Sequence, residues 1–183
     1  MIVRNTTLEG AFIIDVKRFE DDRGHFGKAW STKELEELGV IGRFVEGNFS
    51  FNHKRGTLRG MHYQQAPYGQ GKLVRCTRGS IYDVGVDLRP ESPTYRKWVG
   101  VELTADSERM LYLPGDFGHG YVTLQDHTEV YYQVTTPYVP ESSRGFRWND
   151  PAFAIEWPKL DQLYMNRRDR EYPDFRLTPP KSS

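Results

Sequence analysis

The chain has 183 residues, in which 25 Lys and Arg balance 25 Asp and Glu. A length of ~100–200 residues suits one domain with a sizeable core, so we expect a single domain over residues 1–183. Balanced charge gives no general affinity for nucleic acid or an anionic membrane, and no apolar stretch nears the ~20 residues of a membrane span. The N-terminus lacks the apolar core of a secretory signal, and Cys76 is the single cysteine. We therefore expect a cytoplasmic protein.

The first clear element is a short helix over residues 31–39. Ser31 is a good N-cap residue, Glu34 follows three positions later, and Gly39 is a typical stop. Little else in the sequence indicates helix.

The segment 57–64, Thr-Leu-Arg-Gly-Met-His-Tyr-Gln, gathers polar side chains between two glycine-bearing turns. Side chains alternate along a strand, so Leu58, Gly60 and His62 would share the inner face. Arg59 would then lie on the opposite face. An inward histidine is a ligand, an acid or base, or a satisfied core group, and spacing alone leaves these three alternatives open.

From residue 73 onward the chain breaks into short runs rich in β-branched and aromatic residues, separated by turns. The runs are 73–77, 81–88, 98–103, 110–113, 120–124 and 130–134. Six short strands at this spacing predict an all-β sandwich or barrel. The last stretch, 173–183, contains three prolines and ends in polar residues, which predicts a lightly ordered tail.

Eight segments in order along nearly the whole chain resemble the dTDP-4-dehydrorhamnose 3,5-epimerase family of nucleotide-sugar epimerases. They are 22–26, 56–64, 70–74, 82–89, 92–95, 114–121, Tyr132, and 145–151 leading to 156–158. The resemblance implies a cupin-type jelly-roll barrel with few short helices, a homodimer, and an isomerase that uses neither a cofactor nor a metal.

The resemblance further implies epimerisation at C3, C5 or both of a nucleoside-diphosphate 4-keto-6-deoxy sugar, of the dTDP-4-dehydro-6-deoxyglucose type, in deoxysugar or rhamnose-type biosynthesis. Three alternatives share the barrel. A sugar-nucleotide 3,4-ketoisomerase begins with the same enolisation but moves the carbonyl. A non-catalytic nucleotide-sugar-binding cupin needs no base and acid on opposite faces. A metal-dependent cupin needs a ligand cluster, and Gln64 stands where a second histidine would be expected.

Epimerisation beside a ketone requires a base that removes the C–H proton. His62 suits this role, because a neutral imidazole can accept a proton near neutral pH. In the family an aspartate pairs with this histidine, and Asp169 matches it. Asp83 is a second candidate partner.

The resemblance assigns two further catalytic roles. Lys72 matches a family lysine aimed at the 4-keto oxygen, where a cation stabilises the developing enolate. Tyr132 matches the family's proton donor on the opposite face. Strand alternation makes either Tyr131 or Tyr132 face the core, and the pattern alone does not decide which.

Other positions match the family's substrate contacts. Arg23, Arg59 and His119 match residues that hold the pyrophosphate and sugar, Arg168 stands where relatives carry lysine, Tyr138 matches the aromatic that stacks on the base, and Asn48 is retained. An arginine fork suits phosphate oxygens.

Three positions at the nucleotide end depart from the family pattern. Lys28, Glu46 and Ser143 replace glutamate, glutamine and glutamate. A lysine donates hydrogen bonds where a glutamate accepts them, so the sequence predicts retuned contacts with the nucleotide base. Alternatively, Lys28 and Glu46 neutralise each other and thymidine still binds.

Overall fold

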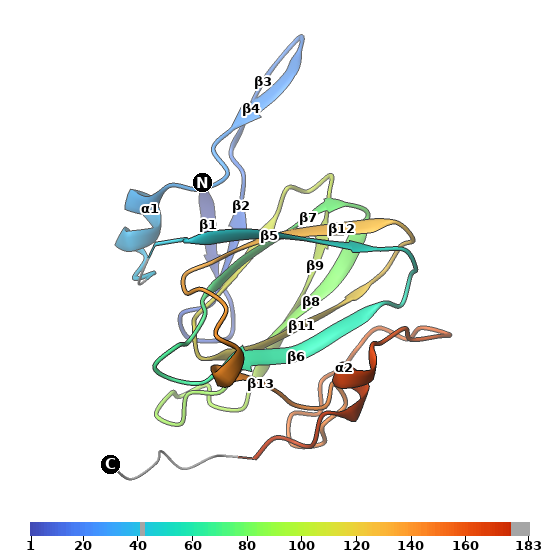
Figure 1. Ribbon diagram of the computed structural model, residues 1–183. Helices are drawn as coiled ribbons and strands as arrows, with labels where there is room; N and C mark the ends of the chain where they lie inside the picture. Colours follow the sequence, from blue (N-terminus) through green and yellow to red (C-terminus); the bar gives the residue numbers. More distant parts are fainter. Residues whose placement is uncertain (41–42, 177–183) are drawn as a thin grey trace.

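Two antiparallel sheets face each other in the computed structural model, which describes residues 1–40 and 43–176 (Figure 1). The six-stranded sheet runs in the order β1 (Ile2–Asn5), β2 (Phe12–Asp15), β10 (Met110–Leu113), β7 (Lys72–Arg78), β12 (Thr128–Val134) and β5 (Glu46–Asn52). The five-stranded sheet runs in the order β13 (Ser143–Gly145), β6 (Leu58–Gln64), β11 (Phe117–Thr123), β8 (Ser80–Asp87) and β9 (Trp98–Thr104). The predicted all-β, cupin-type jelly roll with few short helices is confirmed.

The core lies between the sheets and is built by strand alternation. On β12, Val130 and Tyr132 point into it, while Tyr131 between them packs outside against Phe49. Each of the six predicted runs coincides with a strand. The buried core residues are Leu8, Ala11, Val74, Cys76, Ile81, Val101, Leu103, Leu111, Leu113, Phe117, Tyr121 and Val130.

A hairpin of β3 (Arg18–Asp21) and β4 (Gly24–Gly27) projects away from both sheets (Figure 1). Glu108 anchors it, accepting hydrogen bonds from Arg18 and His25 at 3.1 and 3.0 Å. Two large apolar side chains on it face solvent, since Phe19 is 59% and Phe26 is 75% exposed. Apolar exposure of this size marks a surface that a partner can cover.

Two sequence expectations about local structure need correction. The helix α1 (Thr32–Glu37) forms as predicted, but the Ser31 side chain makes no capping hydrogen bond. A further helix, α2 (Arg167–Glu171), was not predicted, because its five residues are too few to show an apolar periodicity. The remaining helical turn is η1 (Pro140–Ser142).

The predicted tail is wrong for its first residues. Phe175 packs against Phe146 and Phe153, with ring centroids 5.6 and 5.3 Å away, so an aromatic cluster holds the chain there. The rest of the tail, residues 177–183, lies outside the described residues. Within the described ranges, no helix is both long and apolar enough to cross a membrane.

Candidate active site

A bulge in β6 places Arg59 and His62 on the same face of the sheet. On the neighbouring β11, His119 pairs with His62 but Tyr121 pairs with Arg59, so three steps on β6 match two on β11. The extra residue interrupts the alternation. The expectation that Arg59 lies on the face opposite His62 is therefore wrong, and both side chains reach the interior.

Gly60 makes this bulge possible. Its φ of 129° lies in a region that side-chain-bearing residues rarely adopt, and a Cβ there would be 2.6 Å from the Cα of Gly120 on β11. The backbones of β6 and β11 therefore approach each other more closely than they could if residue 60 carried a side chain. This contact sets the spacing between the strand that carries His62 and the strand that carries His119.

His62 pairs with Asp169, the partner that the family resemblance implied, and not with the second candidate, Asp83. The Nε2 atom lies 2.7 Å from Asp169 Oδ1, and Asp169 Oδ2 accepts from the Gly60 backbone N–H at 3.2 Å. Burial by itself would raise the pKa of Asp169, but the hydrogen bond and charge of His62, with the Gly60 N–H, lower it overall. The ionised carboxylate accepts the Nε2 proton, which leaves Nδ1 as the nitrogen that can take a proton.

Asp83 pairs with His119 and not with His62. Asp83 Oδ1 lies 2.7 Å from His119 Nε2, and both side chains are buried. Burial lowers the pKa of His119, despite the opposing effect of Asp83, and favours a neutral ring. The interior thus contains two separate histidine–aspartate pairs on adjacent strands. Sequence could not assign them, because the pairing depends on the register of β6, β8 and β11.

Lys72 begins β7 and is buried, with 9% of its surface exposed. Burial lowers the pKa of its ammonium group to about 8, against the opposing effect of the Asp83 carboxylate. A cation placed in this way is poorly solvated and is available to a developing negative charge on a ligand.

Tyr132, and not Tyr131, faces the interior. It packs against the core and lies opposite Val74 of β7 and Asn48 of β5. Burial raises its pKa, with Arg59 opposing the shift, so the phenol stays protonated at neutral pH and can act as a proton donor.

Arg59 is held from across the barrel by a residue that the sequence reasoning missed. Its Nε donates to Asn52 Oδ1 at 2.8 Å. Asn52 follows Glu46, Asn48 and Ser50 at every second position of β5, and this polar alternation was the available signal. Pinned in this way, the guanidinium group has a fixed orientation at the mouth of the barrel.

A second group of predicted residues meets at the rim beside His62. Arg168 donates to the Ser143 hydroxyl at 2.9 Å. Side-chain hydrogen bonding with Ser143, and to a smaller extent with Arg168, lowers the pKa of Tyr138. Tyr172 links this group to the interior: its ring lies 5.8 Å from that of His62, and the Arg168 guanidinium lies 5.5 Å above it. Tyr172 follows the unpredicted helix α2, and no sequence pattern indicated a role for it.

The structure does not bring Arg23 and Lys28 to this site. Arg23 lies at the tip of the projecting hairpin, bonded to Asp21, with 90% of its side chain exposed. Lys28 pairs with Glu34 of α1 at 2.5 Å, so the alternative in which it pairs with Glu46 is not what the structure has. In Figure 1 the hairpin projects at the top of the molecule, whereas β6 lies in its lower half.

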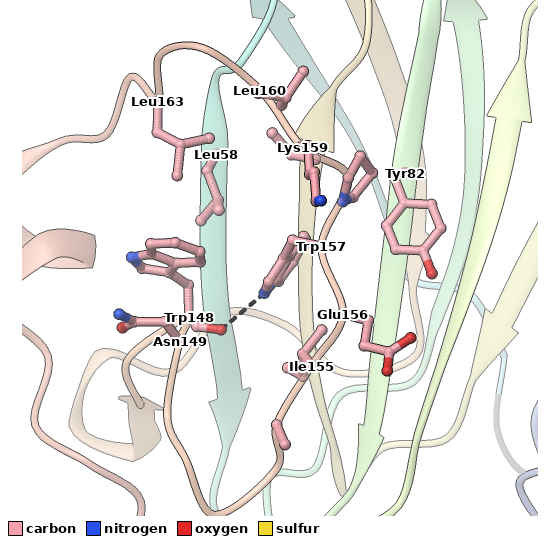
Figure 2. Close-up of a pocket in the computed structure, with 13 residues that line it drawn as sticks. Leu58, Tyr82, Trp148, Asn149, Ile155, Glu156, Trp157, Lys159, Leu160 and Leu163 are labelled. Atoms are coloured by element: carbon pink, nitrogen blue, oxygen red, sulfur yellow. Dashed lines mark hydrogen bonds between the residues drawn. The ribbon is translucent and has the colours of Figure 1, made fainter.

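A separate hollow of about 850 Å³ lies on the outer face of the five-stranded sheet. Figure 2 draws its walls, among them Leu58 and Tyr82 from the strands, with Trp157 donating to the backbone oxygen of Trp148 at 2.9 Å. The bulge in β6 explains why Leu58 lines this outer face while His62 lies inside. The sheet separates the hollow from the two histidine–aspartate pairs.

Comparison with known proteins identifies relatives of the whole chain. The family model described as dTDP-4-dehydrorhamnose 3,5-epimerase matches residues 5–176. A dTDP-4-dehydrorhamnose 3,5-epimerase from Salmonella typhimurium is 43% identical over 176 residues, which cover 94% of this chain and 94% of that protein.

Solved structures agree with this match. A dTDP-4-dehydrorhamnose 3,5-epimerase from Elizabethkingia anophelis superposes with a TM-score of 0.93 at 36% identity, covering 96% of each chain. A dTDP-6-deoxy-D-glucose-3,5-epimerase from Legionella pneumophila, solved in complex with dTDP-4-keto-L-rhamnose, gives a TM-score of 0.86 at 36% identity, covering 96% of this chain and 99% of that one.

Proposed function

Because the chain belongs to the dTDP-4-dehydrorhamnose 3,5-epimerase family and is an isomerase that epimerises a dTDP-4-keto-6-deoxy sugar, we propose that the reaction takes place between His62, Lys72 and Tyr132. The observation that carries this assignment is the His62–Asp169 pair at 2.7 Å in the same interior as a buried lysine. A hydrophobic core with a purely structural role does not require a histidine–aspartate pair and a lysine, because burying charged groups costs free energy.

The proposed reaction has three steps. His62 removes the proton from the carbon beside the 4-keto group, and Asp169 stabilises the imidazolium that forms. The Lys72 ammonium stabilises the negative charge that moves onto the keto oxygen. Tyr132 then returns a proton to the opposite face of the carbon, which inverts it.

Proton NMR in heavy water tests this function. With dTDP-4-keto-6-deoxyglucose as substrate, we expect deuterium to enter at each carbon that is inverted, C3 alone or C3 and C5, with the ketone remaining at C4. A 3,4-ketoisomerase would move the ketone, and a binding protein would exchange no carbon-bound proton. Either result would contradict the proposal.

We propose that the nucleotide end binds thymidine diphosphate despite its three unusual residues. Lys28 pairs with Glu34 and not with Glu46, so its charge is compensated by a different partner from the one expected, and this pair supports retained thymidine binding over a retuned base contact. An exposed pair of this kind contributes little, so Lys28→Met should change the dissociation constant of thymidine diphosphate by less than about fivefold.

Isothermal titration of the diphosphates of thymidine, uridine, cytidine and guanosine measures this preference in the native protein and in Lys28→Met. Tyr138→Ala is the positive control, because it removes the ring proposed to stack on the base. If uridine, cytidine or guanosine diphosphate binds the native protein more tightly than thymidine diphosphate, the three substitutions have retuned the site.

We propose that the protein works as a homodimer in which the β3–β4 hairpin of one subunit completes the site of the other. The hairpin carries Arg23 away from its own barrel, and it exposes Phe19 and Phe26. Phe49 on β5 adds a third exposed ring, at 71%. A closed two-fold arrangement would bury these rings and deliver the arginine to a phosphate.

Mixing two inactive variants tests this arrangement. Arg23→Ala has an intact barrel, and His62→Ala has an intact hairpin, so a hybrid dimer regains one complete site. After subunit exchange, we expect activity to recover to about a quarter of the native value. Arg23→Ala mixed with Arg23→Ala is the control, and no recovery in verified hybrids would contradict the exchange of hairpins.

We also propose a single domain and a cytoplasmic location. The shared core between the two sheets supports the first, and the lone, buried Cys76 agrees with a reducing compartment.

A further inference from the structure

Of the two interior histidines, His62 is the more loosely enclosed. Its side chain is 38% exposed, against 9% for His119, and within the described part of the chain its ring makes one hydrogen bond, from Nε2 to Asp169 Oδ1 at 2.7 Å. A single hydrogen bond restrains one ring atom and leaves the imidazole free to turn about its side-chain bonds. A base that must meet a carbon-bound proton at a fixed distance needs a second restraint on the plane of its ring.

The ring of Tyr172 provides this restraint from the place that a side chain at residue 145 would occupy. Gly145 of β13 pairs with His62 of β6, and paired residues on neighbouring strands direct their side chains to the same face. A Cβ at residue 145 would collide with the Tyr172 ring. The ring therefore lies beside His62, with its centroid 5.8 Å from that of the imidazole and the two planes 68° apart. This edge-to-face arrangement is a favoured geometry for two aromatic rings.

Tyr172 is itself held by contacts of its ring. The Arg168 guanidinium lies 5.5 Å from the ring centroid, and Arg168 in turn donates to the hydroxyl of Ser143 on β13 at 2.9 Å. The Tyr172 hydroxyl is buried and has no hydrogen-bond partner among the residues that the structure describes. The ring, and not the hydroxyl, therefore makes the contacts that fix this side chain.

We propose that Tyr172 is a positioning residue that holds the imidazole of His62 in the orientation in which Nε2 is bonded to Asp169 and Nδ1 is free to accept a proton. This inference rests on the proposed function of His62 as the base. Tyr172 touches no reacting atom, and it acts through the histidine. Without its ring, the imidazole can leave Asp169 and adopt other rotamers, so the base is in place for a smaller fraction of the time.

Turnover at saturating substrate is the first test. Tyr172→Ala removes the ring, and a misplacement of about 1 Å in a catalytic group can cost about 100-fold in rate, so we expect kcat to fall by about 10–100-fold. Measuring kcat at saturation keeps any change in nucleotide affinity through Arg168 out of the comparison. Tyr172→Phe keeps the ring and should retain kcat within about twofold, because it loses a hydroxyl that makes no hydrogen bond among the described residues.

The tautomer of His62 is the second test. In the substrate-free protein, nitrogen NMR reports which ring nitrogen carries the proton, and the His62 signals are assigned by their loss in His62→Ala. We expect the proton to be on Nε2 in the native protein and in Tyr172→Phe, and to be shared between both nitrogens in Tyr172→Ala. This measurement needs no turnover, so it tests the positioning even if another group proves to be the base.

Tyr63→Ala is the matched control. Tyr63 is the next residue after His62 on β6, but it packs on the other face of the sheet against Phe146 and Phe175, with ring centroids 6.3 Å away in both cases. Its replacement should lower thermal stability, because it leaves a cavity among these rings. Both kcat and the His62 tautomer should stay unchanged.

Two results would overturn the proposal. One is an unchanged His62 tautomer in Tyr172→Ala, and the other is an equal loss of kcat in Tyr172→Phe, which would assign the role to the hydroxyl. If Tyr172→Ala does not fold, Tyr172→Leu takes its place with the same expectations, because leucine fills part of the space without a planar edge. Failure of both variants to fold would assign Tyr172 a purely structural role.

Discussion

His62→Ala should abolish the exchange of the substrate's C3 proton with solvent. General-base assistance contributes about 10²–10⁴-fold to such a step, and the second imidazole of the interior, His119, is committed to Asp83. The substrate should still bind, because Arg59, Lys72 and the rim residues remain. Deuterium incorporation followed by proton NMR, with binding checked by titration calorimetry, measures both expectations.

His53→Ala provides the control for this experiment. His53 is exposed and packs against the Phe51 ring on the outside of the barrel, so its loss should leave exchange unchanged. Deuterium uptake by His62→Ala at the native rate would show that another group is the base.

Tyr132→Phe should separate the two halves of the reaction. His62 and Lys72 can still form the enolate, but no phenol is present to protonate its opposite face. We expect exchange at C3 to continue while inversion falls by about 10²–10⁴-fold, the usual contribution of a positioned acid. Comparing deuterium uptake with product formation in the same NMR sample measures the two rates together.

Tyr131→Phe is the matched control, because Tyr131 lies next to Tyr132 on the outer face and packs against Phe49. It should invert the substrate normally. Normal inversion by Tyr132→Phe would instead mean that water or another side chain donates the proton.

The sequence predicted the barrel well because strand alternation is a local property. The residues of 130–134 have the period expected of a half-buried strand, and the structure agrees. The same rule failed at Arg59, because one extra residue in β6 reverses the face of everything before it. Nothing in the local sequence except Gly60 signals that extra residue.

The sequence also could not predict which residues pair when they are far apart along the chain. Asp83 and Asp169 were both candidate partners of His62, and only the register of three strands and the position of a five-residue helix decide between them. The sequence also did not predict that Arg23 would lie far from the barrel. The direction of the hairpin depends on the contacts that Glu108 makes with it, and these join residues far apart in the sequence.

The contact between Gly60 and Gly120 couples the evolution of the two halves of the site. A side chain at either position would collide with the other strand: the Cβ at residue 60 meets Gly120, and the Cβ at residue 120 meets the Met61 sulfur at 2.6 Å. Gly120 directly follows His119, and Gly60 lies two residues before His62. The positions of both histidines depend on the same spacing between β6 and β11. A single mutation here damages both His62 and His119, whereas mutations at the rim affect one contact each. Natural variants of this barrel are therefore expected to diverge in the nucleotide they accept long before they diverge in the chemistry they perform.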